Sequence, residues 1–140
     1  MVPSRKGERV ARIAVVEDDY DISHLIKEVL GEDGHEIVSY FQPSADTIQH
    51  IKQFQPDLVM IDLRLNASVT GWDIVVALED GAAGRRIPVI VCSAALQQMR
   101  DQRAWLEEHG VAVLPKPFDL DDLRHLVEQM LAQGASTART

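Results

Sequence analysis

Four short apolar runs, separated by longer and more polar stretches, dominate the hydrophobic pattern of the chain. Each run holds four to seven residues rich in β-branched side chains, which is too short for a helix and typical of a strand buried on both faces. A fifth segment alternates between polar and apolar positions, as a strand at the edge of a sheet does. The five predicted strands cover residues 10–16, 35–40, 58–61, 89–92 and 111–114.

Helical periodicity occupies the intervals between these strands and the segment after the last one. Asp19 or Asp21 is predicted to cap the first helix, which ends at Gly31 or Gly34. Pro43 predicts the start of the second helix. The predicted helices cover residues 22–30, 43–54, 71–80, 95–108 and 119–131, and the fourth has the weakest amphipathic pattern.

The alternation of strand and helix, repeated five times, predicts an α/β fold: a doubly wound five-stranded parallel sheet with helices on both faces. Five units fit the flavodoxin-like strand order 2-1-3-4-5, in which the polar second strand lies at an edge. A chain of this length is expected to form one domain. We place it at residues 10–132, between an N-terminal extension over residues 1–9 and a flexible tail over residues 133–140.

The chain of 140 residues contains 22 acidic and 14 basic side chains, which gives a formal net charge of −8. This charge repels nucleic acids and anionic lipids, so direct binding to either is not expected. Cys92 is the only cysteine, which excludes an internal disulfide bond and favours a reducing compartment. The apolar stretch near the N-terminus is too short for a signal peptide, and no run is long enough to span a bilayer. These features predict a cytoplasmic protein.

Polar side chains follow four of the five predicted strands, at the edge where ligands bind in such sheets. Taken singly, each has an ordinary explanation as a helix cap, a turn residue or a solvated lysine. Together, several carboxylates need a cation, and oxygen ligands select a hard ion such as Mg²⁺, while a lysine and a hydroxyl can hold phosphoryl oxygens. The pattern predicts phosphoryl transfer with Asp62 as the nucleophile. The candidate residues are Glu17, Asp18, Asp19, Asp62, Ser93 and Lys116.

Four motifs at these strand ends carry a family resemblance. They are residues 13–19 (IAVVEDD), 57–62 (DLVMID), 88–93 (PVIVCS) and 114–118 (LPKPF). In this order they closely resemble the receiver domain of two-component response regulators, of the single-domain type, over roughly residues 10–131.

The resemblance implies that Asp62 accepts a phosphoryl group from the phosphohistidine of a sensor kinase or a phosphotransfer protein. It implies no enzymatic activity beyond the chain's own phosphorylation and slow dephosphorylation. The resemblance also implies that Glu17 and Asp18 bind Mg²⁺ together with Asp62 and the backbone carbonyl of Arg64. Ser93 would sense the phosphoryl group and Lys116 would pair with it. The peptide bond between Lys116 and Pro117 would be cis.

The resemblance also places an output surface on the helix at 95–108, the strand at 111–114 and the helix at 119–131. A downstream protein or a second copy of the chain would bind there. Val113 stands where receivers usually carry an aromatic switch residue, and Asn66 stands where a proline is usual. Trp105, on the first of these helices, is expected to be a packing residue rather than a partner anchor.

Other functions remain to be weighed against this one. The acids at 17–19 would repel a flavin phosphate, and Arg64 stands where aspartate-nucleophile phosphatases usually carry a second aspartate, so neither class fits. A degenerate receiver that serves as an unphosphorylated docking module is the remaining alternative. Magnesium binding separates the two, because a docking module does not need it.

Overall fold

The computed structural model describes residues 10–65, 68–79, 87–94 and 96–138, so the extension at 1–9 and Asn66 lie outside the described residues. Five strands form one parallel sheet in the order β2-β1-β3-β4-β5, which confirms the predicted fold class and the edge position of the second strand. The strands are β1 (Arg12–Val16), β2 (Glu36–Tyr40), β3 (Leu58–Ile61), β4 (Val89–Ser93) and β5 (Ala112–Pro115).

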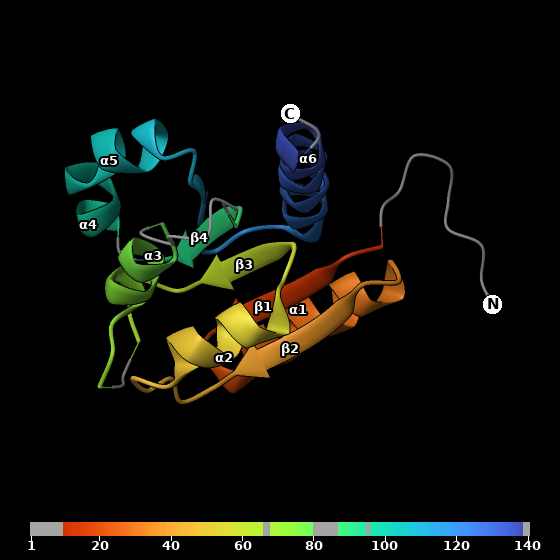
Figure 1. Cartoon of the computed structure of the whole chain (residues 1–140), viewed down its shortest axis with the longest axis horizontal. Coiled ribbons are helices and arrows are strands. Elements are labelled where there is room, and N and C mark those ends of the chain that lie inside the picture. Colours follow the sequence, from red (N-terminus) through yellow and green to blue (C-terminus); the bar gives the residue numbers. More distant parts are fainter. Residues whose placement is uncertain (1–9, 66–67, 80–86, 95, 139–140) are drawn as a thin grey trace.

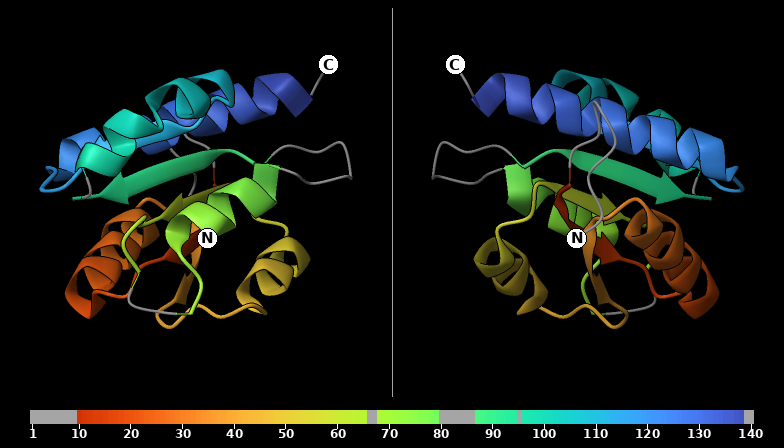
Figure 2. Two further views of the ribbon diagram at one scale, coloured as in Figure 1. Left: turned by 90° about the vertical axis from the view of Figure 1, so that its left-hand side faces the viewer. Right: turned by 90° about the vertical axis from the view of Figure 1, so that its right-hand side faces the viewer.

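Helices cover both faces of this sheet (Figures 1 and 2). One face packs against the first and last helices, and the other face packs against the helices between them. The helices are α1 (Tyr20–Glu32), α2 (Thr47–Phe54), α3 (Gly71–Glu79), α4 (Leu96–Asp101), α5 (Arg103–Glu108) and α6 (Leu120–Ala138). Within the described ranges, no helix has the length and apolar character needed to cross a membrane.

The apolar runs of the sequence divide between two cores, one on each face of the sheet. In β3, Leu58 and Met60 enter the core beneath α1 and α6, while Val59 and Ile61 enter the core beneath α2, α3, α4 and α5. Strands β1 and β4 alternate in the same way. Because successive side chains point to opposite faces, a strand covered on both faces has to be apolar throughout.

Side-chain caps fix where several helices begin. Asp19 accepts a hydrogen bond from the Ile22 backbone N–H at the start of α1, as predicted. At the start of α3, Asp73 and Thr70 form a reciprocal capping box, in which each side chain accepts a hydrogen bond from the other residue's backbone N–H. This cap begins α3 at Gly71, at the end of the loop that follows β3.

Two expectations about helix ends are wrong. Pro43 does not start a helix: Ser44 and Thr47 form a turn through mutual hydrogen bonds, and α2 begins only at Thr47. The last helix continues to Ala138 rather than ending near Leu131, because a single glycine, at 134, disfavours a helix by only about 1 kcal/mol. The helix therefore enters the segment expected to be a flexible tail; its mobility stays a prediction.

Two further differences lie near the second edge of the sheet. The predicted helix at 95–108 consists of two short helices, α4 and α5, separated at Gln102, which agrees with its weak amphipathic pattern. Strand β5 is predicted to be buried on both faces, but it is an edge strand and is only partly buried. Its Val113 side chain is 37% exposed and belongs to neither core.

Candidate functional site

Three carboxylates meet at the carboxyl edge of the sheet. Glu17 and Asp18 follow β1, and Asp62 follows the neighbouring strand β3. One oxygen from each lies within 4.8 Å of the others. Glu17 and Asp62 are buried, with relative exposures of 2% and 7%, whereas Asp18 is half-buried. The convergence predicted from the strand ends is therefore present.

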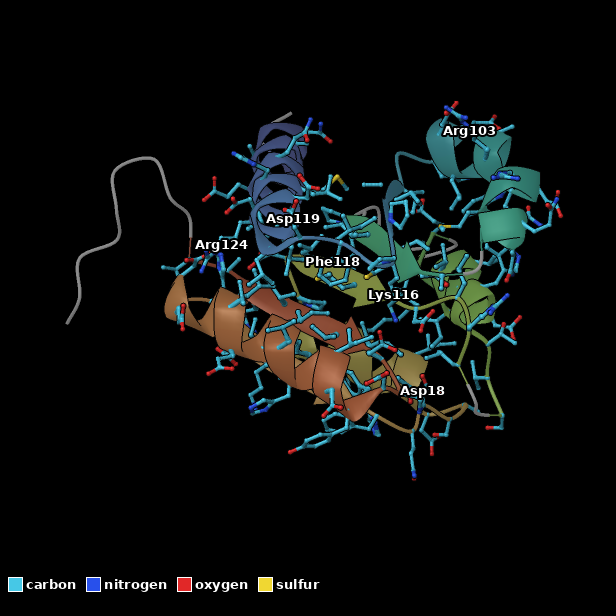
Figure 3. All side chains as sticks on the ribbon, turned by 180° about the vertical axis from the view of Figure 1, so that it is seen from behind. Asp18, Arg103, Lys116, Phe118, Asp119 and Arg124 are labelled. Atoms are coloured by element: carbon cyan, nitrogen blue, oxygen red, sulfur yellow. The ribbon has the colours of Figure 1, made fainter. Side chains whose placement is uncertain are left out.

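Lys116 joins this cluster from the loop after β5. Figure 3 shows it at the same end of the sheet as Asp18, with Arg124 at the opposite end. Its ammonium nitrogen donates hydrogen bonds to Oε1 of Glu17 and, over 3.0 Å, to Oδ2 of Asp62. The Lys116-Pro117 peptide bond is cis, as the resemblance implied. One partly buried cation thus contacts two buried carboxylates.

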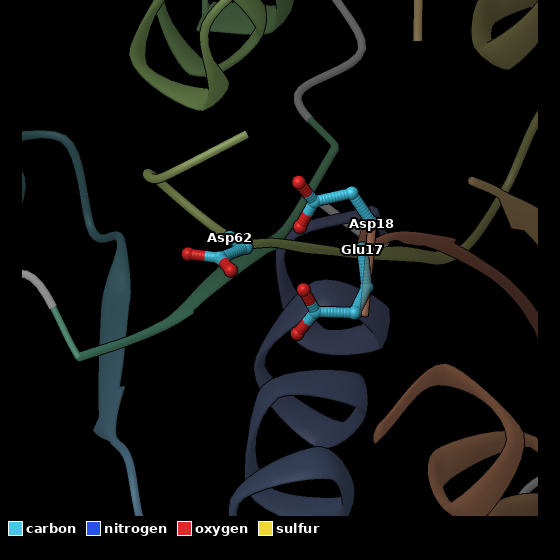
Figure 4. A group of neighbouring side chains, drawn as sticks. All are labelled: Glu17, Asp18 and Asp62. Carbon is cyan, nitrogen blue, oxygen red and sulfur yellow. The ribbon is translucent and has the colours of Figure 1, made fainter. Parts of the chain in front are cut away.

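Glu17 and Asp18 follow one strand and Asp62 follows its neighbour, and the three side chains lie close together (Figure 4). The pKa of Glu17 is raised to about 7: burial is the main cause, Lys116 lowers the pKa and the nearby Asp62 raises it. For Lys116, burial alone lowers the pKa, but the hydrogen bonds to Glu17 and Asp62 outweigh it and leave the pKa above its usual value. The lysine therefore remains charged, while Glu17 takes up a proton near neutral pH when no metal ion is bound.

The backbone around Asp62 is fixed on several sides. Its N–H donates to the Val16 carbonyl over 3.0 Å, and its Oδ1 accepts a hydrogen bond from the Arg64 N–H over 2.9 Å. Gly71, the first residue of α3, lies against its carbonyl group: a Cβ atom there would be 1.9 Å from the Asp62 oxygen. This contact is not predictable from the sequence, in which a glycine at the start of the helix beside the site is its only signal.

The other predicted site residues lie at the same edge. Ser93 is the last residue of β4 and is fully buried, and its carbonyl accepts a hydrogen bond from the Lys116 N–H over 3.0 Å. Asp19 caps α1, so the ordinary explanation of this residue as a helix cap is correct. Arg64 bonds to Asp62 through its backbone, and its side chain is exposed. Burial raises the pKa of Cys92 to about 12, which keeps this thiol protonated and suits a core residue.

The chemistry of this donor set fits a hard divalent cation. The cluster offers carboxylate oxygens only, which is the ligand type that Mg²⁺ prefers. Such an ion keeps coordination positions for water and for phosphoryl oxygens. The arrangement can therefore hold a cation among its carboxylates and offer the ammonium group of Lys116 to phosphoryl oxygens.

Comparison with known proteins agrees with this geometry. A family model described as the response regulator receiver domain matches residues 13–128. The transcriptional regulatory protein PcoR of Escherichia coli is 30% identical over 129 residues, which cover 92% of this chain and 55% of PcoR. The chain spans about half the length of this and several other curated relatives.

Two solved structures show the same fold. The receiver domain of a putative Luxo repressor protein from Vibrio parahaemolyticus has a TM-score of 0.79 and 24% identity, with coverage of 93% of this chain and 96% of that domain. The receiver domain of a Pseudomonas aeruginosa sensor histidine kinase has a TM-score of 0.73 and 21% identity, with coverage of 89% and 99%. That second structure holds a magnesium ion in its active-site cleft.

Proposed function

Since this chain belongs to the response regulator receiver domain family of two-component signalling, we propose that it is a phospho-accepting switch with Asp62 as the acceptor. The donor is the phosphohistidine of a sensor kinase or of a phosphotransfer protein. The observation that carries the proposal is the placement of Asp62 beside the acids after β1 and within hydrogen-bond distance of the ammonium group of Lys116. As in the family generally, the chain promotes only its own phosphorylation and slow dephosphorylation.

The proposed reaction is a single displacement at phosphorus. A carboxylate oxygen of Asp62 attacks the phosphorus atom, so that an O–P bond forms while the P–N bond to the donor histidine breaks. The electron pair of that bond returns to the imidazole nitrogen, which takes up a proton. Lys116 then pairs with the phosphoryl oxygens, since its nitrogen already lies beside Oδ2 of the acceptor.

Glu17 and Asp18 are proposed to hold Mg²⁺ together with Asp62 and the backbone carbonyl of Arg64. When bound, the ion neutralises the acids and the incoming phosphoryl oxygens, so that like charges do not repel. The magnesium ion in the cleft of the Pseudomonas aeruginosa receiver supports this assignment. Glu17 contributes its charge only when deprotonated, because its pKa lies at about 7 without the ion.

Phosphorylation by acetyl phosphate tests the proposal. With Mg²⁺ present, the wild type is expected to gain one acid-labile phosphate, located on Asp62 by mass spectrometry, and Asp62→Asn to gain none. Asp101→Asn is the matched control, because Asp101 is an exposed acid on α4 outside the site. Equal labelling of wild type and Asp62→Asn would overturn the assignment.

The docking-module alternative has one observation in its favour. Val113, in place of the usual aromatic residue, leaves β5 with a partly exposed aliphatic side chain at that position. A docking module needs neither Mg²⁺ nor phosphate, so titration calorimetry with Mg²⁺ separates the two functions. Binding that Asp18→Asn weakens favours the switch, since this change removes a charged oxygen ligand. Absence of binding, together with absence of labelling, favours the docking module.

A further inference from the structure

The candidate acceptor is in direct contact with the start of α3. Gly71 lies so close to the backbone of Asp62 and Leu63 that a Cβ atom would be 1.9 Å from the Asp62 carbonyl oxygen and 2.7 Å from Leu63 Cα. The capping box between Thr70 and Asp73 holds the first turn of α3 as a unit. A displacement of the Asp62 backbone therefore has to move the first turn of α3, because no space separates them.

The residue after Gly71 reaches across to the next helical segment. The Trp72 ring meets the ring of Trp105, on α5, edge to face, with centroids 4.9 Å apart and an interplanar angle of 63°. Trp105 in turn stacks on His109, with ring centroids 3.9 Å apart. Both indoles pack against the core that also contains Leu63, which lies next to Asp62 in the loop between β3 and α3, here called the acceptor loop. Contacts thus run without a gap from the acceptor to α5.

The position where receivers usually carry an aromatic switch residue offers no comparable contact. Val113 is 37% exposed and belongs to neither core. By contrast, Trp72 and Trp105 are half-buried and form one aromatic pair between α3 and α5. Edge-to-face pairs depend strongly on geometry, so a small shift of α3 changes this contact.

From these contacts we propose that the Trp72–Trp105 pair is the link through which phosphorylation of Asp62 changes the α4–α5 segment. The inference rests on the proposed function. Phosphorylation turns one carboxylate oxygen of Asp62 into the bridging anhydride oxygen of an acyl phosphate, which weakens its hydrogen bond to the Arg64 N–H or to Lys116. The acceptor loop then rearranges, Gly71 moves with it, and Trp72 changes its contact with Trp105. The loss or gain of one such aromatic contact changes the equilibrium constant between two arrangements of α5 by about two- to tenfold.

Beryllofluoride, added together with Mg²⁺, serves as a mimic of the phosphoryl group on Asp62. Hydrogen exchange over residues 96–109, with and without this mimic, tests the link in the full chain. In the wild type the mimic is expected to change the exchange rate there by about two- to tenfold. Trp72→Leu is expected to lose this change while still gaining a full acid-labile phosphate on Asp62. Trp72→Phe keeps an aromatic ring and is expected to regain part of the change.

Val76→Ala is the control, because Val76 is an exposed apolar residue on the same helix, and it is expected to behave as the wild type. The two tryptophans are the only ones in the chain, so the emission of Trp72→Phe reports Trp105 alone. An exchange response in Trp72→Leu equal to that of the wild type overturns the link and leaves the acceptor assignment intact. A wild type that takes up no phosphate overturns both.

Discussion

The ammonium nitrogen of Lys116 lies 3.0 Å from Oδ2 of Asp62, although 54 positions separate the two residues in the chain. The same nitrogen also bonds to Glu17, so that a single lysine side chain, 13% exposed, balances two buried acids. Without a metal ion, Lys116 is the positive charge that makes burial of these acids tolerable.

Removal of that charge is expected to destabilise the metal-free protein. Lys116→Met leaves two buried acids without their partner, so the free energy of unfolding in urea should fall by about 3 kcal/mol. Added Mg²⁺ should restore more stability to this variant than to the wild type, because the ion would neutralise the two acids that the lysine neutralises in the wild type. Arg103→Met is the control: it removes an exposed pair with Glu107 and should change stability by less than about 1 kcal/mol.

Magnesium affinity is expected to depend on pH through Glu17. Its pKa of about 7 means that a proton occupies the carboxyl group in more acidic solution and competes with the ion. Titration calorimetry between pH 5.5 and 8.5, a range of about one and a half units around that pKa, should show affinity rising by up to about tenfold per unit and levelling above neutrality. In Glu17→Gln the affinity should be weaker and this rise should be absent. A rise of the same size in Glu17→Gln would assign the titration to another group.

The same titration acts on folding in the absence of a metal ion. The pKa of Glu17 is higher in the folded protein than its ordinary 4.5, so the folded state holds the proton more tightly. The resulting stabilisation is complete below pH 4.5 and is lost as the pH rises through about 7. Compared with Glu17→Gln, the wild type should therefore lose unfolding free energy as the pH rises from 4.5 to about 7, the window that these two pKa values define. Parallel pH profiles for the two proteins would contradict this.

Gly71 is expected to tolerate no side chain. Gly71→Ala places a Cβ atom against backbone atoms of Asp62 and Leu63, which cannot rotate away as a side chain can. We expect a loss of about 2 kcal/mol of unfolding free energy and slower labelling of Asp62 by acetyl phosphate. Gly31→Ala provides the contrast, because it lies in α1 with open space around its Cβ position and should stabilise the protein by up to about 1 kcal/mol.

Arg64 is expected to lengthen the lifetime of the phosphorylated form. Its backbone bonds to the acceptor and its exposed side chain is free to fold over a phosphoryl group and balance its charge. The half-life of the acyl phosphate should shorten a few-fold in Arg64→Ala and in Arg64→Asn, since exposed charge pairs contribute up to about 1 kcal/mol. Equal half-lives in all three proteins would show that the Arg64 side chain does not affect hydrolysis of the acyl phosphate.

Features that depend on local spacing are predictable from the amino-acid sequence alone. The apolar runs predicted strands covered on both faces, and β1, β3 and β4 divide their side chains between two cores because strand side chains alternate. The alternation with helices predicted the parallel sheet and its order. Because parallel strands end at one edge, the residues after them, Asp18 and Asp62 among them, had to converge there.

Contacts between residues that are distant in the chain are not predictable in this way and follow from the three-dimensional packing of the elements. The bond between Lys116 and Glu17 spans 99 positions, and the burial of Glu17 is encoded by no local pattern. The contact of Gly71 with Asp62 depends on how the loop after β3 returns to α3. The partial exposure of Val113 and the meeting of Trp72 with Trp105 depend on how helices cover the β5 edge, because packing between elements is set by their relative positions and not by the periodicity within each.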